Sequence, residues 1–363
     1  MNKSCKKLDF FLGANTPLGF VSRFEQLASP GQWRLYAVKG GPGTGKSTLM
    51  KNATAPLEDA CSEIEYIHCS SDVDSLDAVI IKDYKVAICD GTPPHVVEPK
   101  YPGAFENVVP LTDCWDRSKL FENRHEIIML ADQISRCHEY CVRFLNAAGS
   151  LISDTYRMAL DVTDTGKIKR YATSFAGREF PGAGSTKGTE SVRFLSAVTN
   201  KGLYSFDATA KELCDRIILI DDDYGAVSRI LLSELKNHAI DRGYSVISCY
   251  CPLSPYDKID HLFIPQLSLG FMTKNKFYQP TVPVERCIHA KRFTSMEQLS
   301  LAKKRIGFNQ KGAAQMLREA GRLLAEAKDL HDKLEAYYIA ATDFNKVNAY
   351  ADALKKELEA LLP

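Results

Sequence analysis

The sequence predicts an α/β protein made of two homologous units, each a three-layer parallel sheet followed by a helical hairpin. Three observations predict this fold class. A glycine-rich stretch at 34–50 joins a strand-like segment to a helix-like one, the first half of the chain resembles the second, and each half ends in a helical pattern. Alternating strands and helices favour parallel sheets with right-handed crossovers. We therefore expect two domains, at 1–190 and 191–363.

The glycine-rich stretch reads RLYAVKGGPGTGKSTLM. Its apolar start suits a buried strand, and the residues from Lys46 onward suit a helix. Glycines permit positive φ angles and let backbone N–H groups approach an anion, and the following helix adds the positive end of its dipole. We expect this loop to bind phosphate groups through Gly40, Gly41, Gly43, Thr44, Gly45, Lys46, Ser47 and Thr48.

Three side chains complete the predicted chemistry. Lys46 is expected to reach the β- and γ-phosphates, and the hydroxyl of Ser47 to bind Mg2+. Asp90 ends the apolar strand at 86–89 and is the best candidate for the second magnesium ligand, although it could instead cap a turn. Gly91 follows it, where many motor ATPases have a glutamate that positions water, so fast hydrolysis is not expected. Lys46 and Asp90 are the expected catalytic residues.

Three other polar side chains are candidates for a base or for holding water. Asp72 and Asp74 follow a predicted strand that ends at Cys69, and His95 lies in the loop after Asp90. Ligands of α/β folds bind at the carboxyl ends of parallel strands, where all three would lie. Each of them could equally be a turn or cap residue.

A repeat relates the two halves of the chain. FLGANTPLGFVSRF from Phe11 resembles FLSAVTNKGLYSFD from Phe194, and RIILIDDDYGAVSRILL from Arg216 aligns with the glycine-rich stretch. We infer a duplicated unit. Each copy is expected to contain a lead-in helix, a strand, a loop, a helix and two further strands.

The second copy lacks the residues that would bind phosphate. Its segment 222–229 reads DDYGAVSR, which retains only Gly225 from the turn and has Ser228 in place of the lysine. The carboxylates at 221–223 would repel a triphosphate. We expect a degenerate site without nucleotide, which has a structural role or lends an arginine such as Arg229 or Arg242 to the neighbouring site.

Helical segments follow each copy. The first half predicts one long helix around 127–144 and a second at 151–171. In the second half, a 3,4 spacing of apolar residues from Ala320 to Phe344 allows a coiled-coil arm for a protein partner or for self-association. It also allows a hairpin packed within the chain, with a turn at 343–345. Small alanines in the seam favour the hairpin.

Composition excludes some classes of protein. The chain of 363 residues has 46 Lys+Arg against 45 Asp+Glu, which leaves no net field for nucleic acid. No stretch is long enough to span a bilayer. The eleven cysteines are scattered without a CxxC pair, which predicts free thiols and a cytoplasmic location. Cys137 and Cys141 suit a buried helix face better than a metal site.

At GGPGTGKSTLM the sequence resembles the P-loop NTPase superfamily, whose members bind ATP or GTP with Mg2+. Through HCSSDVDSLDAVI and DGTPPHVVEPKYPGA it is also similar to uncharacterised ATPase-like proteins of Firmicutes-type bacteria, in which two P-loop halves are fused. The resemblance implies nucleotide binding, ATP rather than GTP, by the first half.

The expected function is slow ATP hydrolysis coupled to conformation or to a partner. One alternative is a kinase that transfers the γ-phosphate to a small metabolite or nucleotide, and another is a nucleotide sensor without turnover. The kinase alternative is motivated by the Asp90-Gly91 sequence and by a set of arginines in the segment that follows, namely Arg117, Arg124, Arg136 and Arg143.

Overall fold

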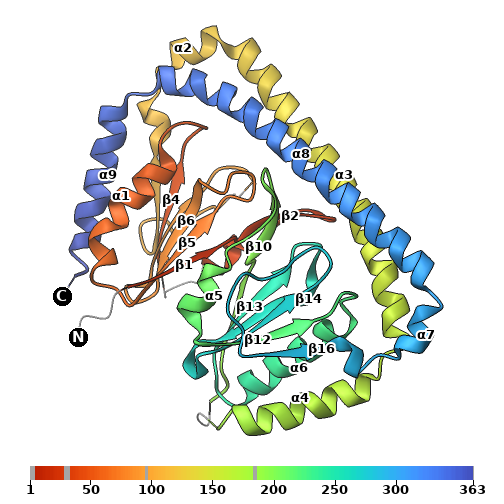
Figure 1. The fold of residues 1–363 in the computed structure, drawn as a ribbon. Coiled ribbons are helices and arrows are strands. Elements are labelled where there is room, and N and C mark those ends of the chain that lie inside the picture. The colour runs from red at the N-terminus through yellow and green to blue at the C-terminus, as the bar shows by residue number, and fades with distance from the viewer. Residues whose placement is uncertain (1–4, 28–32, 95–96, 183–185, 363) are drawn as a thin grey trace.

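Two six-stranded sheets lie side by side, and two long helices run past both of them (Figure 1). The computed structural model describes residues 5–27, 33–94, 97–182 and 186–362. Its architecture is α/β, as the sequence predicts. Within the described ranges, no helix is both long and apolar enough to cross a membrane.

The first sheet is formed by the N-terminal part of the chain. Its strands, in spatial order, are β1 (Lys6–Phe10), β5 (Glu63–His68), β6 (Leu76–Ile81), β7 (Val86–Asp90), β4 (Arg34–Lys39) and β8 (Glu106–Pro110).

The second sheet repeats this order strand for strand. Its members are β9 (Glu190–Arg193), β13 (Val246–Cys251), β14 (Ser254–Ile264), β15 (Leu269–Lys274), β12 (Arg216–Asp221) and β16 (Arg286–His289). The identical order in the two sheets fits the duplicated unit inferred from the sequence.

Both sheets are mixed but mostly parallel, so the prediction of parallel sheets is confirmed in part. β6 runs antiparallel to β5 and β7, and β14 runs antiparallel to β13 and β15. The reason is the length of the connections. A parallel crossover needs a dozen or more residues, whereas the chain leaves β5 at His68 and enters β6 at Leu76. The other neighbouring pairs in both sheets are parallel.

The predicted lead-in helix is a β-hairpin instead. The first copy forms β2 (Gly13–Thr16) and β3 (Gly19–Ser22), and the second forms β10 (Ser196–Thr199) and β11 (Gly202–Ser205). Turn chemistry explains the shared residues. Gly19 has φ 96°, and the hydroxyl of Thr16 donates to its carbonyl, a pair that Thr199 and Gly202 repeat.

The two repeats meet at equivalent residues. Phe11 and Phe194, which the sequence repeat aligns, exchange a pair of backbone hydrogen bonds of 2.9 Å each. This reciprocal contact is the pattern expected where a pseudo-twofold axis passes between two copies.

The long helices pack against each other. α3 (Arg124–Leu160) and α8 (Lys303–Ala341) run antiparallel, preceded by the short α2 (Arg117–Glu122) and α7 (Met296–Ser300) (Figure 1). α3 does not end near Leu151 as predicted. It continues through Gly149, whose missing side chain makes room for Pro17. The apolar seam of α8 is therefore filled by α3 of the same chain.

The last helix of each half covers the opposite half, so neither pair forms the predicted hairpin. α4 (Thr165–Glu179) packs on α6 (Ala226–Asp241) of the second half, and α9 (Phe344–Glu359) packs on α1 (Lys46–Glu58) of the first. The predicted turn at 343–345 is present, where the Asp343 carboxylate accepts from the N–H of Asn345 and begins α9. This exchange ties both halves to the long helices.

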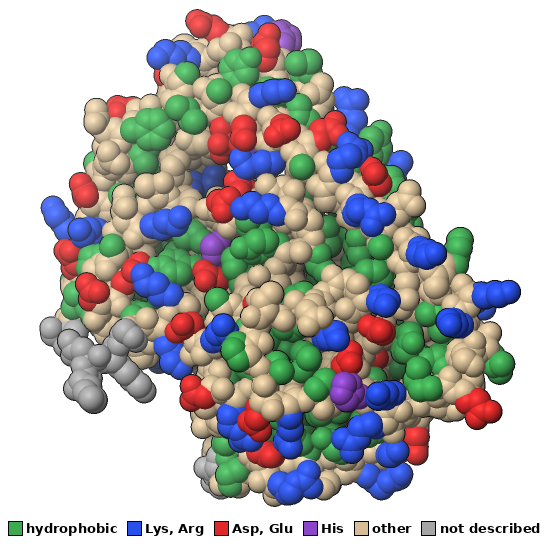
Figure 2. Space-filling model, viewed as in Figure 1, with side chains coloured by type: hydrophobic (Ala, Val, Ile, Leu, Met, Phe, Trp, Pro, Cys, Tyr) green, Lys and Arg blue, Asp and Glu red, His purple; other side chains and the backbone are tan. Residues whose placement is uncertain are grey.

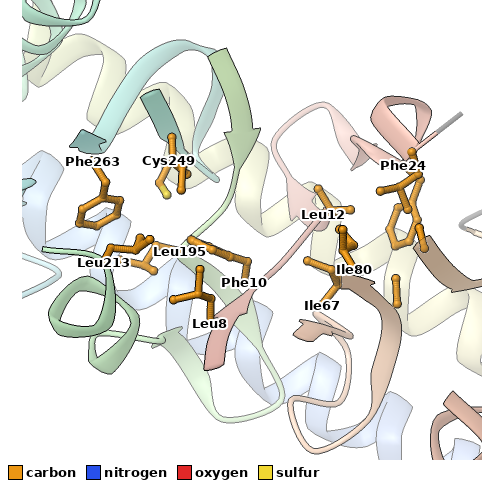
Figure 3. Packing of buried hydrophobic residues seen from close by; sticks show 14 of the residues in the cluster. Leu8, Phe10, Leu12, Phe24, Ile67, Ile80, Leu195, Leu213, Cys249 and Phe263 are labelled. Carbon is orange, nitrogen blue, oxygen red and sulfur yellow. The ribbon is translucent and has the colours of Figure 1, made fainter. Parts of the chain in front are cut away.

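A single apolar core lies between the sheets. Leu8 and Phe10 of β1, Ile67 and Ile80 of the first sheet, and Phe263 of the second belong to one buried cluster (Figure 3). α5 (Ala208–Leu213) completes it. The outer faces of the two sheets are covered by α1 with α9 and by α6 with α4.

A buried ion pair also joins the halves. Arg193 Nε of β9 lies 2.9 Å from Glu65 Oε2 of β5, and the two side chains are 6% and 1% exposed. Lys82 contacts the other oxygen of Glu65. On the surface, Lys and Arg side chains and Asp and Glu side chains are both spread over the face seen in Figure 2, in keeping with the balanced composition.

Candidate functional site

The glycine-rich loop connects β4 to α1, in the strand–loop–helix order predicted. Gly43 and Gly45 have φ angles of 67° and 80°, a region that other residues rarely adopt. The buried hydroxyl of Thr44 donates to the carbonyl of Gly41 at 2.8 Å and fixes the turn. The loop therefore enters α1 with the backbone N–H groups of its first turn at the helix terminus.

Lys46 folds back over this loop. Its Nζ donates to the carbonyls of Gly40 and Gly41 at 2.8 and 2.7 Å, and it lies 3.4 Å from Asp90 Oδ2. The side chain is 13% exposed. Carbonyl oxygens thus hold the ammonium group at the loop.

Asp90 both caps a turn and faces the lysine. Its Oδ1 accepts from the backbone N–H and the hydroxyl of Thr92, which leaves Oδ2 directed at Lys46. The hydroxyl of Ser47 accepts from the N–H of Leu76 at 3.2 Å.

The structure brings the predicted site residues together. A cavity of about 1210 Å³ is lined by all of them: Gly40, Gly41, Gly43, Thr44, Gly45, Lys46, Ser47, Thr48 and Asp90.

The C-terminal end of α8 closes over the loop. The N–H of Gly43 donates to Oε1 of Glu335 at 3.1 Å. A Cβ atom on Gly43 would lie 2.9 Å from Ile339, and one on Gly41 would lie 2.8 Å from Tyr338. A side chain at either position would therefore collide with this helix unless the helix shifted, and at Gly43 the positive φ disfavours other residues as well. Glu335 lies in the second half of the sequence, far from the loop along the chain.

Other side chains that line the cavity come from the long helices. Lys328 of α8 lies 3.4 Å from Asp72, and His331 lies 3.6 Å from Glu335. His138 of α3 faces the same space. Burial and the neighbouring His331 lower the pKa of His138, so this imidazole is neutral near pH 7.

The further candidates from the sequence separate in space. Asp72 lines the cavity, whereas Asp74 is not among its lining residues and forms a 2.8 Å ion pair with Lys201 of the second half. His95 lies outside the described residues. Cys137 and Cys141 are buried, and Cys141 packs in the apolar cluster beneath α8, as the helix-face interpretation predicts.

Three further polar groups that line the cavity were also not predicted as site residues. Asp77 is the second residue of β6, one position beyond the Ala78–Cys89 pair, and so lies beside Asp90. The buried nitrogens Asn15 Nδ2 and Trp115 Nε1 have no acceptor among the described residues. Both residues line the cavity, so two buried donors there are available to a ligand.

The second loop is filled by its own side chain. The carboxylate of Asp222, which is 1% exposed, accepts from four backbone N–H groups at 2.7–3.2 Å. Their donors are Tyr224, Gly225, Val227 and Ser228. The predicted concentration of negative charge is present, and one of these carboxylates occupies the loop itself.

The cavity at the second loop is small, about 70 Å³. Arg229 lies 4.4 Å from the ring centre of Tyr156 and lines this second cavity, and Arg242 donates to the carbonyls of Ala176 and Phe180. Neither arginine is among the described residues that line the cavity at the first loop. The side chains of the second half that do line the first cavity include Lys328, His331 and Glu335 of α8.

A scan against protein-family models found no matching family, and comparisons with curated proteins and with solved structures found no similar protein.

Proposed function

We propose that the chain binds ATP with Mg2+ at residues 40–48, hydrolyses it slowly and couples phosphate binding to the position of α8. One observation carries the proposal: the N–H of Gly43 holds a carboxylate oxygen of Glu335. Phosphate and carboxylate oxygens accept the same kind of hydrogen bond, and glycine loops before a helix are suited to both. The loop in this conformation thus already binds an oxyanion.

The donor set fits the proposed ligand. Loop N–H groups and Lys46 would hold the phosphates, and the oxygens of Ser47, Asp77 and Asp90 would hold Mg2+, which prefers oxygen ligands. Asn15 and Trp115 supply the two buried donors without an acceptor in the described chain. When bound, ATP would supply a transferable γ-phosphoryl group.

Slow turnover follows from what surrounds the loop. With ATP bound, Asp90 would hold Mg2+, and Asp72 is paired with Lys328, so neither carboxylate would be available as a general base. This leaves His138 as a candidate general base. It is neutral, it lines the cavity, and no acidic side chain of the described chain pairs with it. Weak activation of water is the expected result.

Coupling follows from competition at Gly43. A phosphate oxygen and the Glu335 carboxylate cannot both accept this N–H, and their like charges repel. Glu335 would therefore leave when phosphate binds and move the end of α8. Because α8 packs along α3 and leads into α9, which lies on α1, this movement would reach both halves.

Kinase activity remains the second candidate because of the size of the cavity. Ligand pockets usually occupy roughly 300–1,000 Å³, so about 1210 Å³ leaves room for an acceptor beside a nucleotide. The arginines that motivated this alternative do not support it. Within the described chain the cavity lining includes none of Arg117, Arg124, Arg136 and Arg143.

Labelled ATP distinguishes the alternatives. With ATP carrying a labelled γ-phosphate and Mg2+, we expect slow release of labelled phosphate by the wild type and none by Lys46→Ala. Transfer of the label to an added nucleoside monophosphate or sugar would favour the kinase. Binding without release would favour the sensor, and absence of binding would contradict the proposal.

Trp115 offers a readout of the coupling. Its ring packs 5.5 Å from that of Tyr338 on α8, and Trp33 is the other tryptophan of the chain. In a Trp33→Phe variant, ATP with Mg2+ should change the fluorescence of Trp115, since its indole would contact the ligand and α8 would move relative to it. An unchanged spectrum at saturating ATP would contradict both the coupling and the contact of Trp115 with the ligand, but not binding at the loop.

A further inference from the structure

A cluster of three different metal-ligating side chains lies at the carboxyl end of the second sheet. Asp221 ends β12, and Cys287 and His289 belong to the neighbouring strand β16. Their ligand atoms all lie within 4.8 Å of one another. The sheet positions them: His289 is paired with Asp221 in register, and Cys287, two residues earlier, points to the same face.

The distances match a tetrahedral metal centre. His289 Nδ1 lies 3.0 Å from Asp221 Oδ2 and 3.8 Å from Cys287 Sγ. Zinc bonds of 2.0–2.3 Å at tetrahedral angles place nitrogen and oxygen ligands roughly 3.3 Å apart and nitrogen and sulfur ligands roughly 3.5 Å apart. Small side-chain adjustments would therefore allow all three atoms to bind one ion.

The duplicated fold does not require these side chains. Lys39, Val108 and Pro110 occupy the corresponding positions of β4 and β8 in the first half. The same strand pair thus forms there without any metal ligand. Lys274 lies near the second-half cluster, 3.7 Å from Asp221 Oδ1, which leaves Oδ2 for an ion. His289 is 46% exposed, so an ion can reach its nitrogen.

We propose that Asp221, Cys287 and His289 bind a divalent transition metal ion, zinc by preference, with water as the fourth ligand. A thiolate and an imidazole select zinc-like ions over Mg2+ or Ca2+. The ion would tie the end of β16 to β12, just before the chain passes through α7 into α8. This site does not depend on the proposed nucleotide site.

Cobalt substitution tests the site directly in the full chain. Titration with Co2+ should give one equivalent with a thiolate-to-cobalt charge-transfer band, displaced by Zn2+ and not by Mg2+. Cys287→Ser should lose the band, and His289→Ala should weaken it. Zn2+ should raise the melting temperature of the wild type and not that of Cys287→Ser.

The control is Cys5→Ser, because Cys5 Sγ lies 2.9 Å from Cys61 Sγ and that pair is another thiol cluster. It should retain the band. A wild type without the band, or a band that persists in Cys287→Ser or disappears in Cys5→Ser, would overturn the proposal. Matching circular dichroism spectra show that the variants are folded.

Discussion

The two glycine loops hold carboxylates of different origin. In the second half, Asp222 belongs to the loop, accepts four N–H groups and is 1% exposed. In the first half, Glu335 comes from α8, accepts the N–H of Gly43 and is 32% exposed. The first loop is therefore closed by a group that can leave, and the second by one that cannot.

The difference has an energetic basis. Removal of the Asp222 carboxylate would leave several buried donors without a partner, at about 1–3 kcal/mol for each donor that finds no water. Departure of Glu335 would expose one N–H, which water or phosphate can satisfy. Duplication thus preserved the loop shape, while the origin of the carboxylate decides whether a ligand can enter.

The largest effect on stability should come from breaking the buried ion pair that joins the two halves. Glu65→Gln leaves Arg193 and Lys82 without their shared buried carboxylate, and the expected loss of unfolding free energy is about 3–5 kcal/mol. Urea denaturation measures it. Glu63→Gln, which removes a more exposed partner of Lys82, is the control and should cost below about 1 kcal/mol. Equal losses would mean that the Glu65–Arg193 pair has no special role.

The same pair predicts a pH dependence. Burial alone would raise the pKa of Glu65, but the charges of Arg193 and Lys82 outweigh burial and lower it to about 2. Because this lies below the usual 4.5, the stabilisation is complete above that value and is lost as the pH falls toward 2. Between about pH 5 and pH 3, the urea midpoint should therefore fall further in the wild type than in Glu65→Gln. Parallel curves would contradict the assignment.

The second loop can be broken by Asp222→Ala. Loss of four hydrogen bonds to one carboxylate should lower the unfolding free energy by about 2–4 kcal/mol. Asp223→Ala should stay within about 0.5 kcal/mol of the wild type. Asp222→Ala should not gain ATP binding, because Ser228 stands where a lysine is needed. A new site in this variant would show that Asp222 alone keeps nucleotide out.

Lys46→Ala tests the first loop. Loss of a charge-assisted contact of about 1.5–3 kcal/mol should weaken ATP binding by about 10- to 150-fold, with little loss of stability. Lys51→Ala, on the exposed side of α1, should bind ATP as the wild type does. A filter-binding assay measures the affinity of each variant for ATP. If Lys46→Ala binds ATP as tightly as the wild type, the loop is not part of the nucleotide site.

The smallest expected effect is a gain. Glu335→Gln removes the competing charge from Gly43, and about 1 kcal/mol of relief should tighten ATP binding roughly fivefold. Asp329→Asn changes an exposed carboxylate of the same helix and should have no effect. Weaker binding in Glu335→Gln would mean that Glu335 supports the ligand rather than competing with it.

Local features of the fold could be predicted from the sequence, and contacts between distant segments could not. The strand, loop and helix around Lys46 follow from a local pattern, and so does the repeat. The antiparallel β6 follows from a short connection that the prediction of parallel sheets overlooked. The places of Glu335, Tyr338 and Trp115 depend on how α8 and the segment before α2 meet the loop, which no local pattern specifies.

The sequence also could not predict that the last helix of each half covers the opposite half. The apolar faces of α4 and α9 suit either sheet, because the two sheets are copies of each other. Which half each helix covers is decided by the length and direction of α3 and α8, which carry the chain from one half to the other.

Calorimetric titration of the full chain with ATP and Mg2+ tests the central claim most directly. We expect one site per chain, abolished or strongly weakened in Lys46→Ala and tightened in Glu335→Gln. Two sites would show that the Asp222 carboxylate yields to phosphate. No binding in the wild type or in Glu335→Gln would contradict nucleotide recognition by the first loop.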